Sequence, residues 1–264
     1  MEYLGYCAAI LMGISLGLIG GGGSILTVPI LVYLFSQNPL IATTGSLFVV
    51  GSTAFFGAVI SAGKKLIDFK TGILFSIPSF VGVFVARHFI LPSLPEIIYS
   101  DYGVTLTKSL LVMGSFAILM VFSSRAMIRS SRAVAVDSQQ KSTLFSIGLN
   151  GFFVGITTGF VGAGGGFLII PALVILLNLP MKTAVGTSLA IITANSLFGF
   201  VISMNAHPLD WPVLVKVAAI GAIGMFVGQV FSSKVNEKIL KKGFGYFVLL
   251  IGSVVLADQL LKLH

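Results

Sequence analysis

The chain of 264 residues has few charged side chains. Asp, Glu, Lys and Arg together make up 9% of the sequence, whereas 56% of the residues are apolar. A soluble domain is about 25% charged, so water cannot be the solvent for most of this surface. The composition predicts an integral membrane protein. It excludes a soluble enzyme, a nucleic-acid-binding module and a disordered scaffold.

Residue types that carry chemistry are also scarce. Cys7 is the single cysteine, so neither an internal disulfide nor a thiolate metal cluster is expected. No Asp or Glu lies at the centre of an apolar run, so the carboxylate that usually marks a proton or sodium relay is missing. The sequence also lacks H-E-x-x-H, G-x-S-x-G and a P-loop lysine. We expect neither an enzyme nor a metal or other cofactor.

Eight apolar regions are long enough to cross a bilayer, which takes about 20 residues. They cover residues 6–35, 41–62, 71–90, 109–127, 143–178, 183–204, 213–232 and 244–261. The first and fifth regions are too long for one crossing, and a cluster of glycines interrupts each of them. The loops contain Asp68 and Asp210, for which we expect a helix-capping or solvated role.

The two halves of the chain are similar to each other. A shift of 142 residues superimposes the glycine clusters, and residues 13–61 match residues 155–203 at 19 of 49 positions without a gap. The spacing of glycines and prolines does not follow from membrane composition, so the match indicates a duplication. We expect a first membrane repeat over residues 1–128, a basic cytoplasmic linker over 129–142 and a second membrane repeat over 143–264.

Positive charge distinguishes parallel halves from inverted ones. If all eight regions crossed once, the halves would be parallel and the Lys and Arg residues would divide about 9 to 7 between the two faces. If the first and fifth regions are hairpins with limbs of about 15 residues, the division becomes about 12 to 4. The positive-inside rule favours the second arrangement, with both termini outside. The predicted fold class is an all-α integral membrane protein with two inverted repeats, each a glycine-broken re-entrant helical hairpin plus three spanning helices.

The glycine clusters predict an anion site. Non-helical backbone at membrane depth is tolerated only where it lines a cavity or is buried in protein. A second limb beginning at Ser24 or Gly166 would direct free N–H groups and a positive helix end at the turn. Close helix packing is the alternative, and it is the expectation for the isolated pair Gly224 and Gly228. The predicted site residues of the two turns are Gly22, Gly23, Ser24, Gly164, Gly165 and Gly166.

The spans that follow the hairpins carry polar groups at helical spacing. Ser46 and Thr53 lie seven residues apart and therefore on one helix face, and Ser188 and Asn195 repeat the pattern. These neutral donors can bind an oxyanion without holding it too tightly to release. Hydrogen bonding between helices, worth about 0.6 kcal/mol on average, is the alternative.

Three cationic or titratable side chains lie toward the predicted outer ends of spans. Arg87 and His88 end the third span, and Lys216 begins the seventh. For Arg87 and Lys216, the expectation is that the long side chains extend to the membrane surface. A role in attracting anions is the alternative.

The doubled motifs resemble those of the TauE/SafE family of sulfite exporters, also grouped as toluene sulfonate uptake permeases. Each half has a glycine turn (residues 20–23 and 162–166), a Pro-x-Leu segment, and a box ending in Ser-Leu (residues 42–47 and 184–189). The resemblance covers nearly the whole chain. Ser24 departs from it, because it replaces the last glycine of the first cluster, and this predicts two turns of different geometry. Thr187, beside Ser188 in the second box, joins the predicted substrate-binding residues.

The resemblance implies transport of sulfite, sulfoacetate, other organosulfonates or related sulfur oxyanions across the inner (cytoplasmic) membrane of a prokaryote. The glycine turns and the neutral polar groups of the spans also predict an anion transporter. The missing carboxylates favour export, with alternating access. An anion channel and an importer of organosulfonates are the alternatives, and a membrane assembly factor or sensor is a different class. The expected partners are a small anion and the bilayer, with no nucleic acid. The sequence leaves the oligomeric state open, a homodimer included.

Overall fold

The computed structural model describes residues 2–101, 104–129, 144–177, 179–232 and 237–262. The described part of the first half contains α1 (Glu2–Ile19), η1 (Gly21–Leu26), α2 (Thr27–Pro29), η2 (Ile30–Leu34), α3 (Pro39–Gly63), α4 (Phe69–Phe84), η3 (Val85–Ile90), α5 (Leu91–Ser93), β1 (Ile97–Asp101), β2 (Val104–Thr107) and α6 (Lys108–Arg129). The second half contains α7 (Leu144–Val161), α8 (Gly166–Leu177), α9 (Met181–Ser203), α10 (Trp211–Phe231) and α11 (Glu237–Leu261). Apart from Arg129, the predicted basic linker lies outside the described residues.

The predicted apolar regions are helical in the structure, which confirms an all-α membrane protein. Among the described residues, six helical segments are long and apolar enough to cross a membrane by length and composition. The two overlong regions break at their glycines as predicted, but the limbs are unequal, so the expectation of about 15 residues for every limb is wrong. The first limbs α1 and α7 have 18 residues each, and α8 has 12. At 1.5 Å per residue, α8 is about 18 Å long, well short of a hydrocarbon core of about 30 Å.

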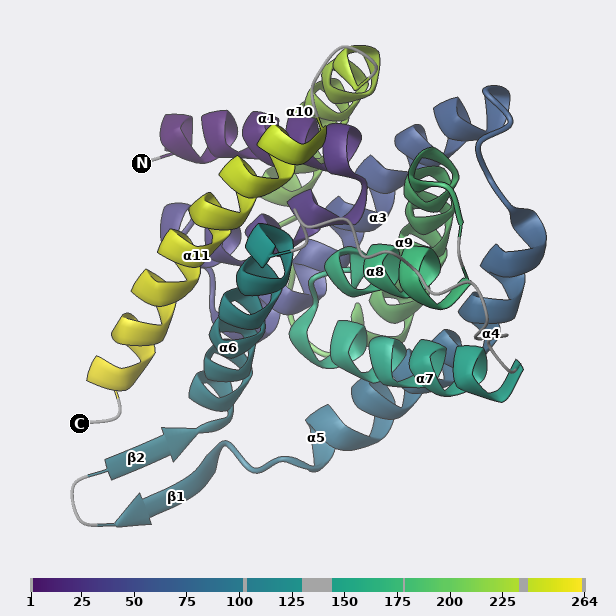
Figure 1. The fold of residues 1–264 in the computed structure, drawn as a ribbon. Coiled ribbons are helices and arrows are strands. Elements are labelled where there is room, and N and C mark those ends of the chain that lie inside the picture. The colour runs from purple at the N-terminus through teal and green to yellow at the C-terminus, as the bar shows by residue number, and fades with distance from the viewer. Residues whose placement is uncertain (1, 102–103, 130–143, 178, 233–236, 263–264) are drawn as a thin grey trace.

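One antiparallel hairpin interrupts the helical pattern. Strands β1 and β2 pair Ser100 with Thr105 and project from the start of α6, away from the helices (Figure 1). The sequence does not predict this hairpin, because the hairpin is short and lies between two strong membrane-spanning signals.

The helices pack in pairs that join the two halves of the chain. Helix α1 packs against α10, α4 against α7, α3 against α9, and α6 against α11 (Figure 1). The 142-residue shift relates α1 to α7, α3 to α9 and α4 to α10, and α6 and α11 correspond as the last helices of the two halves. Under this correspondence the first two pairs exchange with each other, and each of the other two pairs maps onto itself. The contacts α3–α10 and α4–α9 also exchange.

Glycines bring the α1–α10 and α4–α7 pairs into backbone contact. A Cβ on Gly13 would overlap the carbonyl oxygen of Gly221, and a Cβ on Gly155 would overlap that of Ser79. Cβ atoms on Gly224 and Gly228 would likewise contact backbone atoms of α1. The packing role predicted for Gly224 and Gly228 is therefore confirmed. Small residues let membrane helices approach this closely, which replaces the hydrophobic driving force that lipid does not supply.

Equivalent aspartates begin equivalent helices. The Asp68 side chain accepts a hydrogen bond from the backbone N–H of Thr71 at 3.1 Å, at the start of α4. The Asp210 side chain accepts one from Val213 at 3.3 Å, at the start of α10. Each carboxylate satisfies an N–H group that has no partner inside its helix. The predicted capping role of these two loop residues is confirmed.

Candidate functional site

The two glycine turns, here called the elbows (residues 20–24 and 162–166), begin alike and then differ. Gly20 and its counterpart Gly162 both have left-handed backbone, with φ of 82° and 78°. In the second elbow Gly164 and Gly165 are also left-handed, whereas the first elbow continues directly into the 3₁₀ helix η1. This difference confirms the predicted effect of a serine at position 24. Ser24 donates a hydrogen bond to the Gly21 carbonyl at 2.8 Å, within its own elbow.

The two elbows meet backbone to backbone. A Cβ on Gly21 would overlap main-chain atoms of Gly166, and a Cβ on Gly166 would overlap the Cα of Gly21. All ten elbow residues are buried, and Ser24 has no exposed surface. The junction of the two repeats is therefore main chain against main chain.

Each elbow also contacts the serine box of the other repeat. Ser46 donates hydrogen bonds to the Gly162 carbonyl at 2.6 Å and to the Thr43 carbonyl at 2.8 Å. On the equivalent side, a Cβ on Gly20 would lie 3.2 Å from the Ser188 hydroxyl oxygen. The structure thus brings the predicted serines to the predicted turns, but across the repeats. Thr187 lies differently, because its hydroxyl oxygen accepts a hydrogen bond from the backbone N–H of Asp68 at 2.9 Å.

Thr53 and Asn195 occupy equivalent buried positions on the central helices α3 and α9. Asn195 donates a hydrogen bond to Ser79 on α4 at 2.6 Å, and its amide oxygen has no partner. The Thr53 hydroxyl has no partner either, and faces the α10 position equivalent to Ser79, where a Cβ on Gly221 would lie 3.0 Å away. A buried polar group without a hydrogen bond costs about 1–3 kcal/mol. These positions therefore retain unused hydrogen-bonding capacity.

Two further hydroxyls at the second elbow were not predicted. A Cβ on Gly165 would overlap the Thr158 hydroxyl, and a Cβ on Gly164 would lie 3.0 Å from the Ser196 hydroxyl. Both side chains are buried, and neither hydroxyl has a hydrogen-bond partner. They lie beside the N-terminus of α8, where the backbone N–H groups of Leu168 and Ile169 donate to the Gly165 carbonyl at 2.9 and 3.0 Å. Ser196 could have been predicted from its position next to Asn195 in the sequence. Thr158 could not have been predicted from the repeat, because its counterpart in the first half is Leu16.

A polar cleft of about 320 Å³ leads toward the first elbow. Lys64 and Lys182 lie at its mouth, where α3 ends and α9 begins, and Val185 in its wall contacts the Gly20 position. Its described lining contains no Asp or Glu, so the cleft is positively charged. The complete lining is Gly17, Leu18, Ser61, Lys64, Leu66, Lys182, Val185, Gly186, Gln229 and Ser232.

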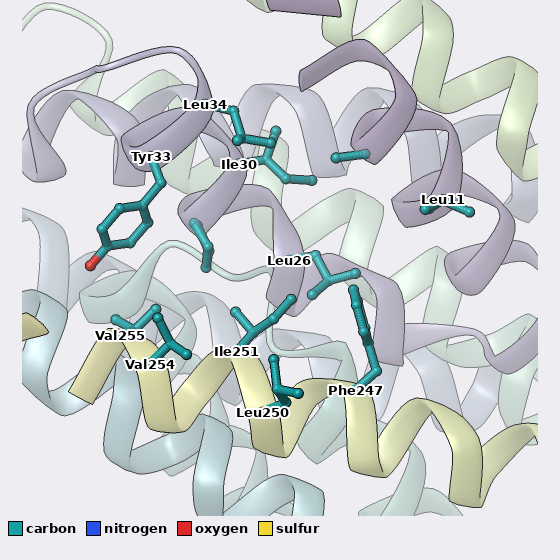
Figure 2. Close-up of a pocket in the computed structure, with 12 residues that line it drawn as sticks. Leu11, Leu26, Ile30, Tyr33, Leu34, Phe247, Leu250, Ile251, Val254 and Val255 are labelled. Atoms are coloured by element: carbon teal, nitrogen blue, oxygen red, sulfur yellow. The ribbon is translucent and has the colours of Figure 1, made fainter. Parts of the chain in front are cut away.

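A second cavity, of about 360 Å³, has a different character. Figure 2 shows apolar side chains of η1 and η2, including Leu26 and Ile30, facing Ile251 and other residues of α11. Its only side-chain oxygen belongs to Tyr33, which donates a hydrogen bond to Asp258 at 2.7 Å. An apolar lining cannot replace the hydration of an anion. We therefore assign the candidate anion path to the lysine cleft, and neither of these two cavities is lined by the elbow residues themselves.

Arg87 corrects a prediction. The expectation that it extends to the membrane surface is wrong, since its side chain is only 6% exposed. It donates hydrogen bonds to the Thr44 hydroxyl and the Thr43 carbonyl, both at 3.1 Å. The π-helical turn η3 orients it toward α3, a feature that hydropathy does not encode. Lys216 is exposed, as expected.

A metal centre has no support in the described part of the chain. There, no group of three or more His, Cys, Asp or Glu side chains is arranged to hold a metal ion. The chemistry offered by the site consists of backbone N–H groups, hydroxyls, the carboxamides of Asn195 and Gln229, and cations, which are groups that bind anions.

Comparison with known proteins agrees with this chemistry. The family model described as sulfite exporter TauE/SafE matches residues 6–255. A probable membrane transporter protein of Xylella fastidiosa (strain 9a5c) is 30% identical over 93% of this chain and 91% of its own. The probable membrane transporter protein YunE of Bacillus subtilis is 28% identical over 89% and 90% of the two chains, and a Methanocaldococcus jannaschii relative with the same description is 26% identical over 88% and 85%. No solved structure matches the chain.

Proposed function

Because the chain belongs to the sulfite exporter TauE/SafE family, we propose that this membrane transporter carries sulfur oxyanions such as sulfite, sulfoacetate or other organosulfonates out of the cell. The membrane is the inner membrane of a prokaryotic cell. The observation that carries the proposal is the meeting of the two elbows beside buried hydroxyls that have no partner. A partly desolvated oxyanion needs such donors.

The exchange of helix contacts between the halves supports two copies related by a twofold axis, and the division of positive charge favours the inverted arrangement. Pairs α1–α10 and α4–α7 replace each other under the 142-residue shift, as expected for two copies related by a twofold axis. Transporters built from inverted repeats bind substrate where broken helices of the two copies meet. Access alternates when one copy rocks against the other around that fixed site. In the present chain, the fixed site corresponds to the elbow junction.

The proposed binding groups are neutral. The elbow N–H groups, Ser46, Thr53, Ser188 and Asn195 would donate to the oxyanion, and Thr158 and Ser196 extend this set at the second elbow. Neutral donors bind an anion through charge-assisted hydrogen bonds of about 1.5–3 kcal/mol each. A full ion pair buried at the same place would hold the substrate more tightly and slow its release.

The direction follows from the membrane potential. Moving one negative charge out of a negative interior is favourable by about 2.3 kcal/mol per 100 mV. Export therefore needs no coupling ion, in keeping with the absence of acidic residues from the centres of the spans. Uptake of the same anion would need a partner ion, a proton or a steep gradient.

The first experiment measures flux in proteoliposomes across sulfite, thiosulfate, sulfate, sulfoacetate and taurine. The variant Asn195→Ala removes the side-chain amide N–H group, which donates to Ser79 in this structure and would donate to the oxyanion. We expect its half-saturating oxyanion concentration to rise at least about tenfold, since a lost hydrogen bond to an anion costs about 1.5–3 kcal/mol. Thr193→Ala is the matched control on the same helix, because the Thr193 hydroxyl bonds only the Leu189 carbonyl of its own helix.

Unchanged affinity in Thr53→Ala, Ser188→Ala and Asn195→Ala would remove these residues from the site. The same preparation separates a carrier from an anion channel, since a carrier saturates at low substrate and shows counterflow. If none of the five compounds is transported or stabilises the protein against heat, the transport proposal itself fails.

A further inference from the structure

Arg87 is a buried cation without a described anionic partner. Its Nη1 and Nη2 atoms bind Thr44 and Thr43, whereas its Nε–H has no hydrogen-bond acceptor. Among the described residues, no carboxylate lies within ion-pair distance of it. Burying a charge costs several kcal/mol unless a partner compensates it, and charges retained inside membrane proteins usually mark a substrate pathway.

The position of Arg87 connects it to the second elbow. The Thr43 carbonyl, which accepts from Nη2, also accepts from Ser46, and a Cβ on Gly162 would contact this same oxygen. Only Thr43 therefore separates the guanidinium from Gly162, the first residue of the second elbow.

The internal repeat relates Arg87 to the lysine cleft at the other end of the molecule. The 142-residue shift places Arg87 over Gln229, Thr43 over Val185 and Thr44 over Gly186. Gln229, Val185 and Gly186 all line the open cleft. Along α3, Thr44 and Lys64 are 20 residues apart, which corresponds to about 30 Å, so the two regions lie at opposite ends of this central helix.

The region equivalent to the open cleft contains the buried Arg87 side chain. In the cleft wall, Gln229 donates a hydrogen bond to the Ser61 hydroxyl at 3.1 Å and lines the open space together with Gly186. On the opposite side, the longer Arg87 side chain reaches α3 and donates a hydrogen bond to the hydroxyl of Thr44, the residue equivalent to Gly186. One of the two equivalent regions is an open cleft, and in the other a buried arginine stands at the position of Gln229.

We propose that Arg87 is an anion-binding gate for small oxyanions on the face opposite to the Lys64–Lys182 cleft, an inference that rests on the proposed transport function. In this structure the gate is closed, with the guanidinium docked on Thr43 and Thr44. When the halves rock, the guanidinium exchanges these two acceptors for the oxygens of a sulfite or sulfonate group. Its planar fork matches two such oxygens at once.

The test compares oxyanion flux in right-side-out and inside-out membrane vesicles, with sulfite and sulfoacetate as probes. Arg87→Gln introduces the residue that the second repeat carries at the equivalent position. We expect its half-saturating concentration to rise at least tenfold for anion supplied on the Arg87 face, and less than twofold for anion supplied at the lysine cleft. Maximal flux and thermal stability should stay within twofold and within a few degrees of the wild type. Lys216→Gln, which removes an exposed cation, is the matched control and should change neither side more than twofold.

Three outcomes would overturn the gate. They are a half-saturating concentration unchanged on both faces, an equal rise on both faces, and a fall in maximal flux alone, which would assign Arg87 a structural role. If Arg87→Gln does not fold, Arg87→Lys decides with Lys216→Arg as control, because lysine keeps the charge but loses the planar fork. We then expect a rise of about threefold on the Arg87 face, and no difference from the control would overturn the gate. If the wild type transports neither probe, it is the proposed function that fails.

Discussion

At the scale of single residues, the second elbow combines left-handed backbone with a hydroxyl that has no partner. Gly165 has φ of 67°, and a Cβ there would overlap the Thr158 hydroxyl. A side chain at this position would face two separate penalties. The left-handed conformation costs an L-residue roughly 1–2 kcal/mol, and Thr158 would have to move from the space beside the α8 N-terminus.

Replacing Gly165 by Ala should therefore reduce both stability and transport. We expect the free energy of unfolding to fall by at least about 1–2 kcal/mol and the oxyanion affinity to fall with it. Thermal unfolding in detergent and flux in liposomes measure the two effects. Gly114→Ala on α6 is the control, because a Cβ there meets nothing within 4 Å, and it should leave flux unchanged. A Gly165→Ala protein as stable and active as this control would exclude a tight turn at the second elbow.

The sequence predicted some residue roles and not others. Repetition in both halves identified Ser46 and Ser188, and the structure places each beside an elbow. Thr158 has no polar counterpart in the first repeat, so repetition could not reveal it. Arg87 was misread because hydropathy reports the depth of a residue along a span, not whether the residue faces lipid or protein.

At the scale of elements, the start of α4 depends on one carboxylate. The Thr71 hydroxyl donates a hydrogen bond to Asp68 at 2.7 Å, and the Thr71 backbone N–H donates a second one at 3.1 Å. These bonds hold the pKa of the Asp68 carboxyl below its ordinary value. The ionised form of Asp68 therefore stabilises the folded state more than the unfolded state.

The variant Asp68→Asn isolates this charge, since asparagine remains a good N-cap. The folded-state pKa is lowered, so the extra stability of the wild type is complete above the unfolded pKa and is lost as the pH falls through the folded value. Thermal unfolding should show the wild type more stable than Asp68→Asn at about pH 5–7, with the difference closing below about pH 4. Thr71→Val removes the hydroxyl donor and should lose most of the extra stability that the ionised Asp68 gives the wild type. A difference that is constant down to pH 3 would contradict the role of the charge.

Element boundaries were predictable where burial in lipid dominates. The ends of α3, α6, α9 and α10 lie within a few residues of the predicted apolar regions, because hydropathy changes sharply there. The π-helical turns η2 and η3 were not predictable, since they depend on how neighbouring helices pack around them. The unequal limbs have a similar origin, because the length of α8 is set by where Gly166 must lie against Gly21.

At the scale of the whole molecule, the repeat predicts on which face of the membrane each loop lies. Lys65 follows α3 and His207 follows α9, and the two positions are equivalent under the 142-residue shift. Inverted copies place equivalent loops on opposite faces of the membrane, whereas parallel copies place them on the same face.

Single thiols test this statement. In a Cys7→Ser background, Lys65→Cys should react with a membrane-impermeant maleimide only from the cytoplasm, and His207→Cys only from outside. Intact cells and inside-out vesicles provide the two sides, and the Cys7→Ser protein without an added thiol gives the background, because Cys7 itself is exposed. Labelling of both positions from one face would show parallel halves.

The contact between Gly21 and Gly166 also bears on how such proteins diversify. Neither position accepts a side chain without pushing the other main chain away, so this point cannot be tuned by substitution. Adaptation to a new cargo has to proceed through the surrounding shell, at Thr158, Ser196 or Arg87. Under the proposed function, the junction of the two copies and the choice of cargo can therefore evolve independently, and a single scaffold can serve many anions without redesign of its mechanics.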